Sequence, residues 1–223
     1  MFGHGTAKEL SAPPVSMSLI EEINHRVANE YAEAIASLSL AASRAGDDEV
    51  KVTLARVANR LRDHADSHRV LIPPSTDSTA NLADYIGRIC QAYSKATLAE
   101  RGVLLALDMA DVELPADRCW RIGLVLTELI RNAARHGLRG GGGKISVRIA
   151  QSSGQLICAV SDTGQRPTHS IPGRGQHVIR SLVADLGGSV EWSFTSTGSF
   201  AVMRIPDPHQ ATVRSEHMAQ LQA

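Results

Sequence analysis

The chain has 223 residues, of which 43% are hydrophobic and 21% are charged, a composition typical of one large or two small globular domains. Its 23 basic and 23 acidic residues give a formal net charge of zero, which argues against a nucleic-acid-binding or membrane-surface protein. No apolar run is long enough to span a membrane, and the N-terminus lacks a signal-peptide pattern, so we expect a cytoplasmic protein without membrane insertion. The cysteines Cys90, Cys119 and Cys158 form no CxxC pair and predict buried free thiols rather than a metal site or a disulfide.

The N-terminal third of the chain predicts two helices. Residues 1–16 carry two glycines and two prolines without periodicity and predict a flexible leader. Apolar residues then recur at spacings of three and four, first from about Ser16 or Ser18 to Arg44 and then up to Leu71. Gly46 suits the end of the first helix, and Asp47 or Asp48 suits the N-cap of the second. We therefore expect an antiparallel helical hairpin over residues 17–72.

The apolar stripe of this hairpin has too few partners to be buried by two helices alone. Pairing two hairpins into a four-helix bundle would bury it, so we predict a homodimer. Docking of the hairpin onto the rest of the chain is the alternative.

Residues 73–79, Pro-Pro-Ser-Thr-Asp-Ser-Thr, predict a linker and a domain boundary. Residues 80–206 then predict an α+β domain, a two-layer α/β sandwich with helices on one face of a mixed sheet. The expected elements are helices at 82–100, 115–136 and 176–186 and strands at 103–108, 112–114, 144–150, 156–161, 189–194 and 199–205. Residues 207–223 predict a polar tail.

Two polar side chains share one face of the helix expected at 115–136. Leu126, Leu129 and Ile130 fall at helical spacing toward a core, whereas Glu128 and Asn132 lie four residues apart on another face. A carboxylate and a carboxamide together can hold Mg²⁺, water and phosphate oxygens. The same pair also fits an ordinary solvated helix face.

Three other patterns have both a chemical and an ordinary interpretation. His25 lies beside the apolar stripe of the first helix, where a neutral imidazole can attack phosphorus or simply face solvent. Asp162-Thr163-Gly164 follows a strand, so the Asp can point into a pocket while the backbone turns away. Gly173-Arg174-Gly175 precedes a helix, whose N-terminus favours phosphate.

The order and spacing of these parts resemble two-component sensor histidine kinases of the HWE-like branch. The first motif is Glu22-Ile23-Asn24-His25-Arg26-Val27-Ala28-Asn29, and the stretch from Thr127 to Gly137 resembles the family's N box. Asp162-Thr163-Gly164 resembles the first glycine box, and Gly173-Arg174-Gly175 with the segment 182–188 resembles the second. The resemblance covers roughly residues 18–206.

The resemblance implies a dimerisation and phosphotransfer hairpin followed by a Bergerat-type ATP-binding catalytic domain, with ATP and Mg²⁺ as cofactors. By position, His25 would accept the phosphoryl group, Asn132 would ligate Mg²⁺, and Glu128 would polarise a metal-bound water or assist catalysis. Asp162 would accept a hydrogen bond from the adenine amine, and Gly164, Gly173 and Gly175 would shape the lid around the phosphates. The expected function is autophosphorylation of His25 from ATP, followed by transfer to an aspartate of a response-regulator receiver domain. The length leaves no room for a sensory domain in front, so we expect input from a separate sensor protein or a ligand.

The chain departs from the family pattern around the lid, between Gly164 and Gly173. Gln165-Arg166 replaces the usual x-Gly, and a non-glycine residue in a left-handed conformation costs about 1–2 kcal/mol, around a tenfold loss of affinity. One alternative is therefore an ATP-independent histidine phosphotransferase with a degenerate nucleotide-binding domain. Another is a non-catalytic dimeric adaptor for a response regulator.

Four further histidines are not assigned to the chemistry of the site. His64 and His68 lie four residues apart on the stripe of the second helix, without a third ligand in view, and are assigned to packing rather than to metal binding. His136 and His177 are expected near the nucleotide pocket without a catalytic role.

Overall fold

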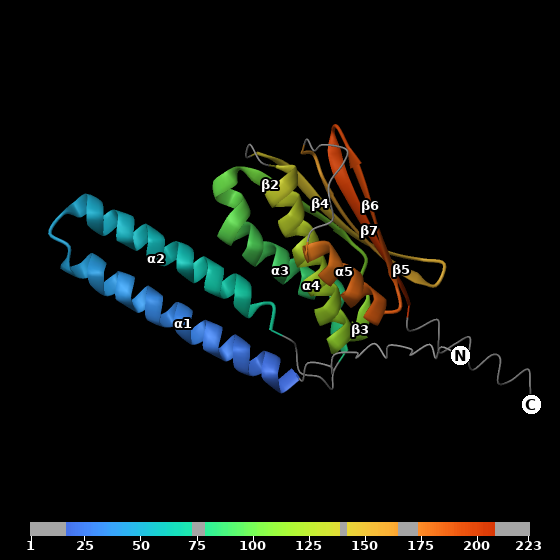
Figure 1. Cartoon of the computed structure of the whole chain (residues 1–223), viewed down its shortest axis with the longest axis horizontal. Helices are drawn as coiled ribbons and strands as arrows, with labels where there is room; N and C mark the ends of the chain where they lie inside the picture. Colours follow the sequence, from blue (N-terminus) through green and yellow to red (C-terminus); the bar gives the residue numbers. More distant parts are fainter. Residues whose placement is uncertain (1–16, 73–78, 139–141, 165–173, 208–223) are drawn as a thin grey trace, which may run out of the picture.

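The structure, a computed structural model, describes residues 17–72, 79–138, 142–164 and 174–207. The expected leader (1–16), most of the linker (73–79), part of the glycine run at 140–143, Gly173 with the lid, and the tail beyond residue 207 lie outside the described residues. Within the described part the expected architecture is confirmed. A helical hairpin is followed by a two-layer α/β domain (Figure 1).

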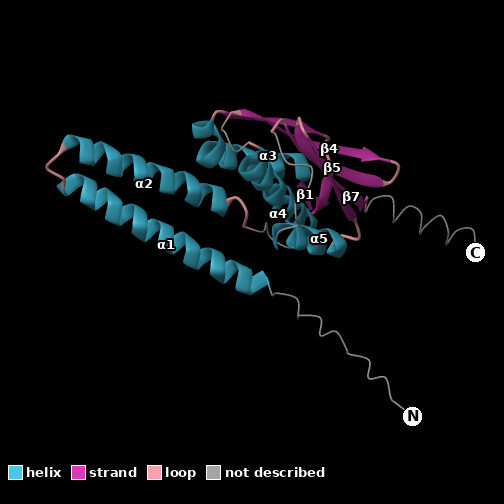
Figure 2. Cartoon of the chain, turned by 45° about the horizontal axis from the view of Figure 1, so that its top comes forward, coloured by secondary structure: helices cyan, strands magenta, loops and turns pink. Residues whose placement is uncertain are grey.

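The hairpin consists of α1 (Met17–Arg44) and α2 (Asp48–Arg69), which run side by side and antiparallel (Figures 1 and 2). Asp47 is the N-cap of α2, and its Oδ1 accepts a hydrogen bond from the backbone N–H of Glu49 at 2.7 Å. Arg62 of α2 donates to Ser39 Oγ of α1 at 3.2 Å, which ties the two helices together across the hairpin. These local signals explain why the sequence predicted both helices and the turn between them.

The second domain contains three main helices. They are α3 (Leu82–Tyr93), α4 (Ala116–Asn132) and α5 (Arg174–Asp185). α3 continues into a π-helical turn, η1 (Ser94–Leu98), and a 3-10 turn, η2 (Ala99–Arg101), and α4 continues into a π-helical turn, η3 (Ala133–Gly137). The sequence predicted uninterrupted helices at 82–100 and 115–136, because apolar spacing does not distinguish a terminal π-helical turn from α-helix.

Five strands form one mixed sheet in the order β2-β4-β5-β7-β6. Their bounds are β2 (Val103–Met109), β4 (Gly143–Ser152), β5 (Gln155–Asp162), β6 (Ser189–Thr195) and β7 (Gly198–Pro206). β2 and β4 are parallel and the other neighbours are antiparallel. The helices α3, α4 and α5 cover one face of this sheet, as expected (Figure 2).

A second, two-stranded sheet corrects the boundary of the predicted linker. β1 (Thr79–Asn81) pairs with β3 (Glu113–Pro115), so Thr79 belongs to a strand and not to the linker. The composition of the segment 73–79 indicated a loop, but pairing with a strand more than 30 residues later overrides that local preference.

The core lies between the helices and the inner face of the sheet. Side chains from every layer are almost fully buried, including Ile86, Ile122, Ile130, Ile145, Ile179 and Met203. Cys90, Cys119 and Cys158 are buried free thiols, as predicted. Burial raises the pKa of Cys90 and of Cys158 to about 12, so both thiols are neutral at physiological pH. None of the described helices combines the length and apolarity that crossing a membrane requires.

Candidate nucleotide and phosphoryl-transfer site

α4 presents two different faces, as its sequence predicted. Leu126, Leu129 and Ile130 are at most 3% exposed and pack into the core. Glu128 and Asn132 lie on a partly exposed face of the same helix. Arg131 Nη2 lies 3.3 Å from Glu128 Oε2, so a cation faces this carboxylate. The helix therefore carries both candidate groups at the surface of a rigid, well-packed element.

Gly175, at the start of α5, lies against these two side chains. A Cβ atom added to Gly175 would stand 2.8 Å from Glu128 Oε1 and 3.6 Å from Asn132 Nδ2. Glycine therefore allows the beginning of α5 to approach the polar face of α4 closely. The structure thus brings together Glu128, Asn132 and Gly175, three residues that the sequence analysis assigned to one site.

Asp162, the last residue of β5, is a buried carboxylate that is 6% exposed. Its Oδ1 accepts a hydrogen bond from the backbone N–H of Gly164 at 2.9 Å. Its Oδ2 accepts a hydrogen bond from the hydroxyl of Ser199, which lies opposite Asp162 in the antiparallel register of β5 and β7. These two donors fix the orientation of the carboxylate and leave it further lone pairs for a ligand.

The end of η3 touches the end of β5 at Gly137. A Cβ atom on Gly137 would stand 2.6 Å from Asp162 Cγ, and a Cβ atom on Gly164 would collide with the backbone of Gly137. The chain therefore needs glycine at both positions to pack the two segments this closely. As a result, the helix that carries Glu128 and Asn132 ends directly against Asp162.

Two further residues support the same corner of the domain. Arg101 donates to the backbone carbonyls of Ala134 and Leu138, both at 2.8 Å, and so satisfies acceptors at the end of η3. Thr163 Oγ1 accepts a hydrogen bond from the backbone N–H of Lys144 at 3.0 Å, which holds the segment after β5 against β4. Because the helix end and the strand end are both anchored, the position of Asp162 relative to α4 is well defined.

Ser199 and Arg101 were not predicted from the sequence, and Gly137 and Thr163 were named there only within motifs, without a role of their own. Their roles depend on pairings across the sheet and between distant segments, such as Asp162 with Ser199 in β5 and β7. A correct prediction that β5 and β7 are neighbours would have placed Ser199 opposite Asp162. No local pattern around Ser199 gives that information.

The residues present fit a nucleotide with its metal ion. Asp162 has acceptor capacity for an exocyclic amine, because only two of its lone-pair positions are used by the bonds described above. Glu128 and Asn132 offer the oxygen ligands that Mg²⁺ prefers, directly or through water. Gly175 lies against them in the first turn of α5, and a helix N-terminus favours phosphate oxygens. When bound, the metal would neutralise phosphate charge during transfer.

His25 lies in α1 and is exposed to solvent, as predicted. α2 is the helix of the hairpin that packs against α3 and η1, whereas α1 lies along the other side of α2 (Figure 1). The described arrangement therefore brings Glu128, Asn132, Asp162, Gly164 and Gly175 into one region and leaves His25 on a separate element.

The other histidines among the described residues lie in α2, η3 and α5. His64 and His68 are half-buried in α2, and the ring of His68 lies 6.5 Å from that of Tyr31 in α1, which supports a packing role. Among the described residues, no group of three or more His, Cys, Asp or Glu side chains is arranged to hold a metal ion. His136 lies in η3 beside Gly137, and His177 is exposed in the first turn of α5.

Two family models match the chain, and together they span residues 22–205. The family described as "Histidine kinase-like ATPase domain" matches residues 92–205, and the family described as "Histidine kinase" matches residues 22–97. The chain therefore belongs to the histidine kinase family, as its motifs predicted.

Curated relatives agree with this assignment. The chain is 27% identical over 209 residues to blue-light-activated histidine kinase 2 of Erythrobacter litoralis, which covers 87% of this chain and 58% of that protein. It is 28% identical over 196 residues to the sensor histidine kinase PdtaS of Mycobacterium tuberculosis, which covers 84% of this chain and 39% of that protein. The chain thus spans only about half the length of these relatives.

Solved structures share the fold. The histidine kinase domain of the blue-light-activated kinase EL346 from Erythrobacter litoralis aligns with a TM-score of 0.57 and 22% identity, covering 82% of this chain and 98% of that one. A bacterial phosphotransferase aligns with a TM-score of 0.60 and 13% identity, covering 87% of this chain and 98% of that one. Both similarities confirm the fold class expected from the sequence.

Proposed function

We propose that the chain is a protein-histidine kinase that phosphorylates its own His25 from ATP and passes the phosphoryl group to an aspartate of a response-regulator receiver domain. The observation that carries this proposal is the anchored carboxylate of Asp162, which lies against Gly137 at the end of the helical segment that carries Glu128 and Asn132. Membership of the histidine kinase family gives that arrangement its chemical meaning.

Each residue has a defined role in the proposed reaction. Asp162 would accept a hydrogen bond from the adenine amine, Asn132 would ligate Mg²⁺, and Gly164 and Gly175 would shape the site around the phosphates together with Gly173, which lies outside the described residues. A ring nitrogen of His25 attacks the γ-phosphorus, the bond to the β-phosphate oxygen breaks, and ADP leaves. Glu128 would assist by accepting the proton that His25 releases or by polarising a water held by the metal. Positioning and charge neutralisation do most of the work in this class of reaction.

We also propose that two chains pair through their hairpins, over residues 17–72. The hairpin exposes large apolar side chains, including Ile23 (49%), Leu40 (50%), Val50 (45%) and Val57 (43%). A second hairpin would cover part of this exposed apolar surface in a four-helix bundle. In this proposal the catalytic domain, over residues 80–206, is the part of each chain that binds ATP. The proposed setting is the cytoplasm, without a nucleic-acid partner.

Incubation with labelled ATP and Mg²⁺ tests the kinase directly. We expect label on the wild-type chain that survives base and is lost in acid, the behaviour of a phosphoramidate. His25→Gln should abolish the label without unfolding the protein, because His25 is exposed, and Ser37→Ala, at an exposed position of the same helix, should keep it. Absence of His25-dependent label from the wild-type chain would exclude the kinase.

The second candidate is an ATP-independent phosphotransferase. The pair Gln165-Arg166 in place of the usual x-Gly favours it, and so does the structural similarity to a protein named as a bacterial phosphotransferase. It predicts no heat of ATP binding in calorimetry, together with transfer of label between His25 and a phosphorylated receiver domain. A non-catalytic adaptor would instead bind a receiver equally well after His25→Ala and would carry no label at all.

A further inference from the structure

Arg131 forms an ion pair with Glu128 on the polar face of α4. Its Nη2 atom lies 3.3 Å from Glu128 Oε2, and the two residues are three positions apart on the helix. Arg131 was not assigned a role of its own from the sequence. On a solvated helix, an ion pair at this spacing adds only a little to helix stability.

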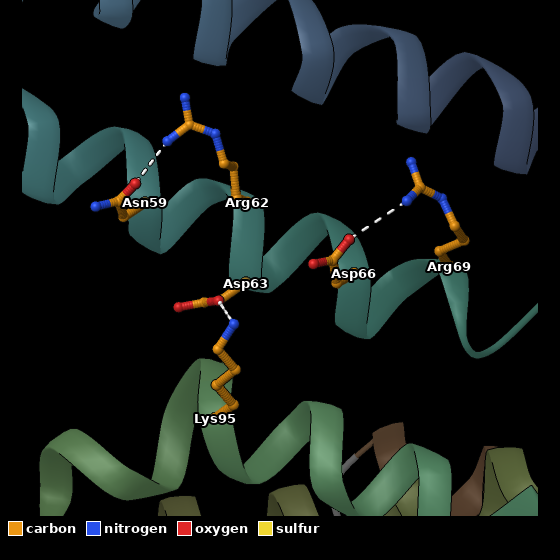
Figure 3. Close-up of polar contacts among 6 residues, drawn as sticks. All are labelled: Asn59, Arg62, Asp63, Asp66, Arg69 and Lys95. Carbon is orange, nitrogen blue, oxygen red and sulfur yellow. Dashed lines mark hydrogen bonds and ion pairs between the residues drawn. The ribbon is translucent and has the colours of Figure 1, made fainter.

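Another ion pair of the same kind lies on α2 and serves as a comparison. Arg69 and Asp66 have the same spacing and the same 3.3 Å distance (Figure 3). Their side chains are 67% and 60% exposed, so water solvates both charges. The Glu128 side chain, in contrast, is only 25% exposed, while that of Arg131 is 56% exposed. Arg131 therefore reaches from the surface to a carboxylate that is largely covered by protein.

The two carboxylate oxygens of Glu128 have different surroundings. Oε2 faces Arg131, whereas Oε1 faces the beginning of α5, where a Cβ atom on Gly175 would stand 2.8 Å from it. The terminal torsion of a glutamate side chain has a broad, roughly two-fold preference, so the side chain alone does not fix the carboxylate plane. The contact with Arg131 selects one orientation, in which Oε1 is presented toward α5.

Tyr93, the last residue of α3, lies near both charges of this pair. Burial raises the pKa of Tyr93, the positive charges of Arg131 and Arg101 lower it, and the carboxylate of Glu128 raises it. Because burial dominates, the phenol stays neutral and cannot act as a counter-charge. Arg101 already donates to two backbone carbonyls at the end of η3. In the described part of the chain, Arg131 is therefore the cation that orients Glu128.

We propose that Arg131 is a positioning residue for phosphoryl transfer, which holds Oε2 of Glu128 so that Oε1 accepts the proton that His25 releases. This inference rests on the proposed kinase function and on the first of the two roles proposed there for Glu128. A ring nitrogen of His25 bonds to the γ-phosphorus, the bond to the β-phosphate oxygen breaks, and the imidazole proton passes to Oε1. Arg131 acts through Glu128 and makes no contact with ATP.

Rates of His25 labelling at several concentrations of ATP with Mg²⁺ separate positioning from binding. Arg131→Met keeps a long apolar side chain and removes the charge. We expect the maximal rate to fall about tenfold, because the carboxylate is still present but no longer held in one orientation. The KM for ATP, and the ATP affinity measured by calorimetry, should stay within about twofold of the wild type.

Three matched variants identify the source of this effect. Arg131→Lys keeps a cation within reach of Oε2 and should retain at least about half of the wild-type rate, because the contact uses a single nitrogen. Arg69→Met removes the equally spaced pair of α2 and should label like the wild type. In a Glu128→Gln background, Arg131→Met should cause no further loss, because Arg131 acts through that carboxylate.

The outcomes separate this role from the kinase function itself. Labelling of Arg131→Met at the wild-type rate would overturn the positioning role, and so would a slower rate that weaker ATP binding explains or a further loss on top of Glu128→Gln. If Glu128→Gln gives no measurable label, the comparison of rate with affinity and the rescue by lysine decide. Absence of His25 label from the wild-type chain would reject the kinase and the positioning role together.

Discussion

The hairpin and the ATP-binding domain bury their apolar side chains to very different degrees. Among the hairpin side chains that the structure describes, Ala58 alone is fully buried, while Leu40, Val50 and Val57 are 43–50% exposed. In the ATP-binding domain, residues of the helices and the sheet, such as Ile122, Ile145 and Met203, are completely covered by their neighbours. One region completes its own core within this chain, and the other does not.

The difference shows where stability comes from in each region. The ATP-binding domain should fold from contacts within the chain, because its core is closed and its glycines fit one close arrangement around Asp162. The hairpin should depend on association, because two helices leave a stripe of apolar surface in water. Substitutions in the hairpin should therefore change association, and substitutions in the ATP-binding domain should change the free energy of unfolding.

A charge introduced among the exposed apolar side chains of the hairpin should have the largest effect, which is on dimer formation. In Val57→Asp, each chain of the proposed dimer would bury an unpaired carboxylate at about 3–5 kcal/mol, which would dissociate the dimer. Sedimentation at micromolar concentration should show monomers. Val52→Asp, on the side of α2 that lines a groove with Glu100 of η2, should remain associated. A Val57→Asp variant with unchanged mass would show that the stripe is not the dimer interface.

A cavity in the core of the ATP-binding domain should have the next largest effect, and this effect is on the free energy of unfolding. Ile130 is 1% exposed, so Ile130→Ala should lower the free energy of unfolding of the ATP-binding domain by about 2–5 kcal/mol. Leu40→Ala in the hairpin, at a side chain that is 50% exposed, should change it little. Chemical denaturation followed at Trp120 and Trp192 measures both. Equal losses in the two variants would contradict the contrast between the regions.

Loss of the hydroxyl that orients Asp162 should weaken nucleotide binding rather than folding. Ser199→Ala removes a hydrogen bond to a charged group, a contribution of about 1.5–3 kcal/mol, and we expect at least a tenfold loss of ATP affinity. Ser199→Thr keeps a hydroxyl and should bind within a few-fold of the wild type. Ser193→Ala, at an exposed position of β6, is the control. Unchanged affinity in Ser199→Ala would show that Ser199 does not position Asp162.

The buried thiols predict a loss of stability in alkali. Burial raises the pKa of Cys119 to about 11 and that of Cys90 to about 12, from an ordinary value of 9.0. Above pH 9 the unfolded thiols lose protons that the folded ones keep, so stability is full below pH 9 and falls as pH rises toward 11–12. The slope is about 1.4 kcal/mol per pH unit for each thiol. Denaturation series between pH 8 and 11 should show a shallower slope for Cys90→Ala, and equal slopes would refute this account.

The smallest effect on the free energy of unfolding is expected for a substitution of Tyr85. The hydroxyl of Tyr85 is buried and finds no hydrogen-bond partner among the residues that the structure describes. Removing an unpaired buried hydroxyl is close to neutral or stabilising, so Tyr85→Phe should change the free energy of unfolding by less than about 0.5 kcal/mol or raise it slightly. A loss above about 1 kcal/mol, measured by urea denaturation, would mean that the hydroxyl is bonded in solution.

Local patterns predicted most of the elements. Helical spacing and the Asp47 cap gave the hairpin, and alternation between turns gave the strands of the sheet. The same patterns placed Glu128 and Asn132 on one face of α4 and Asp162 at the end of a strand. These predictions succeeded because each depends on residues only a few positions apart.

Contacts between distant segments could not be predicted in the same way. The pairing of Thr79 with Pro115 and of Asp162 with Ser199 depends on strand neighbours that no local pattern specifies. The close approach of Gly137 to Asp162 and the ion pair between Asp63 and Lys95 likewise join segments more than 20 residues apart. The sequence therefore predicted the parts of the site, and the structure supplied their arrangement.

Calorimetric titration with ATP and Mg²⁺ tests whether α4 and Asp162 form a working nucleotide pocket. We expect saturable binding by the wild-type chain and at least a tenfold weaker affinity in Asp162→Ala, with His25→Gln unchanged because His25 lies on the hairpin. Absence of binding by the wild-type chain, or equal binding by Asp162→Ala, would contradict it.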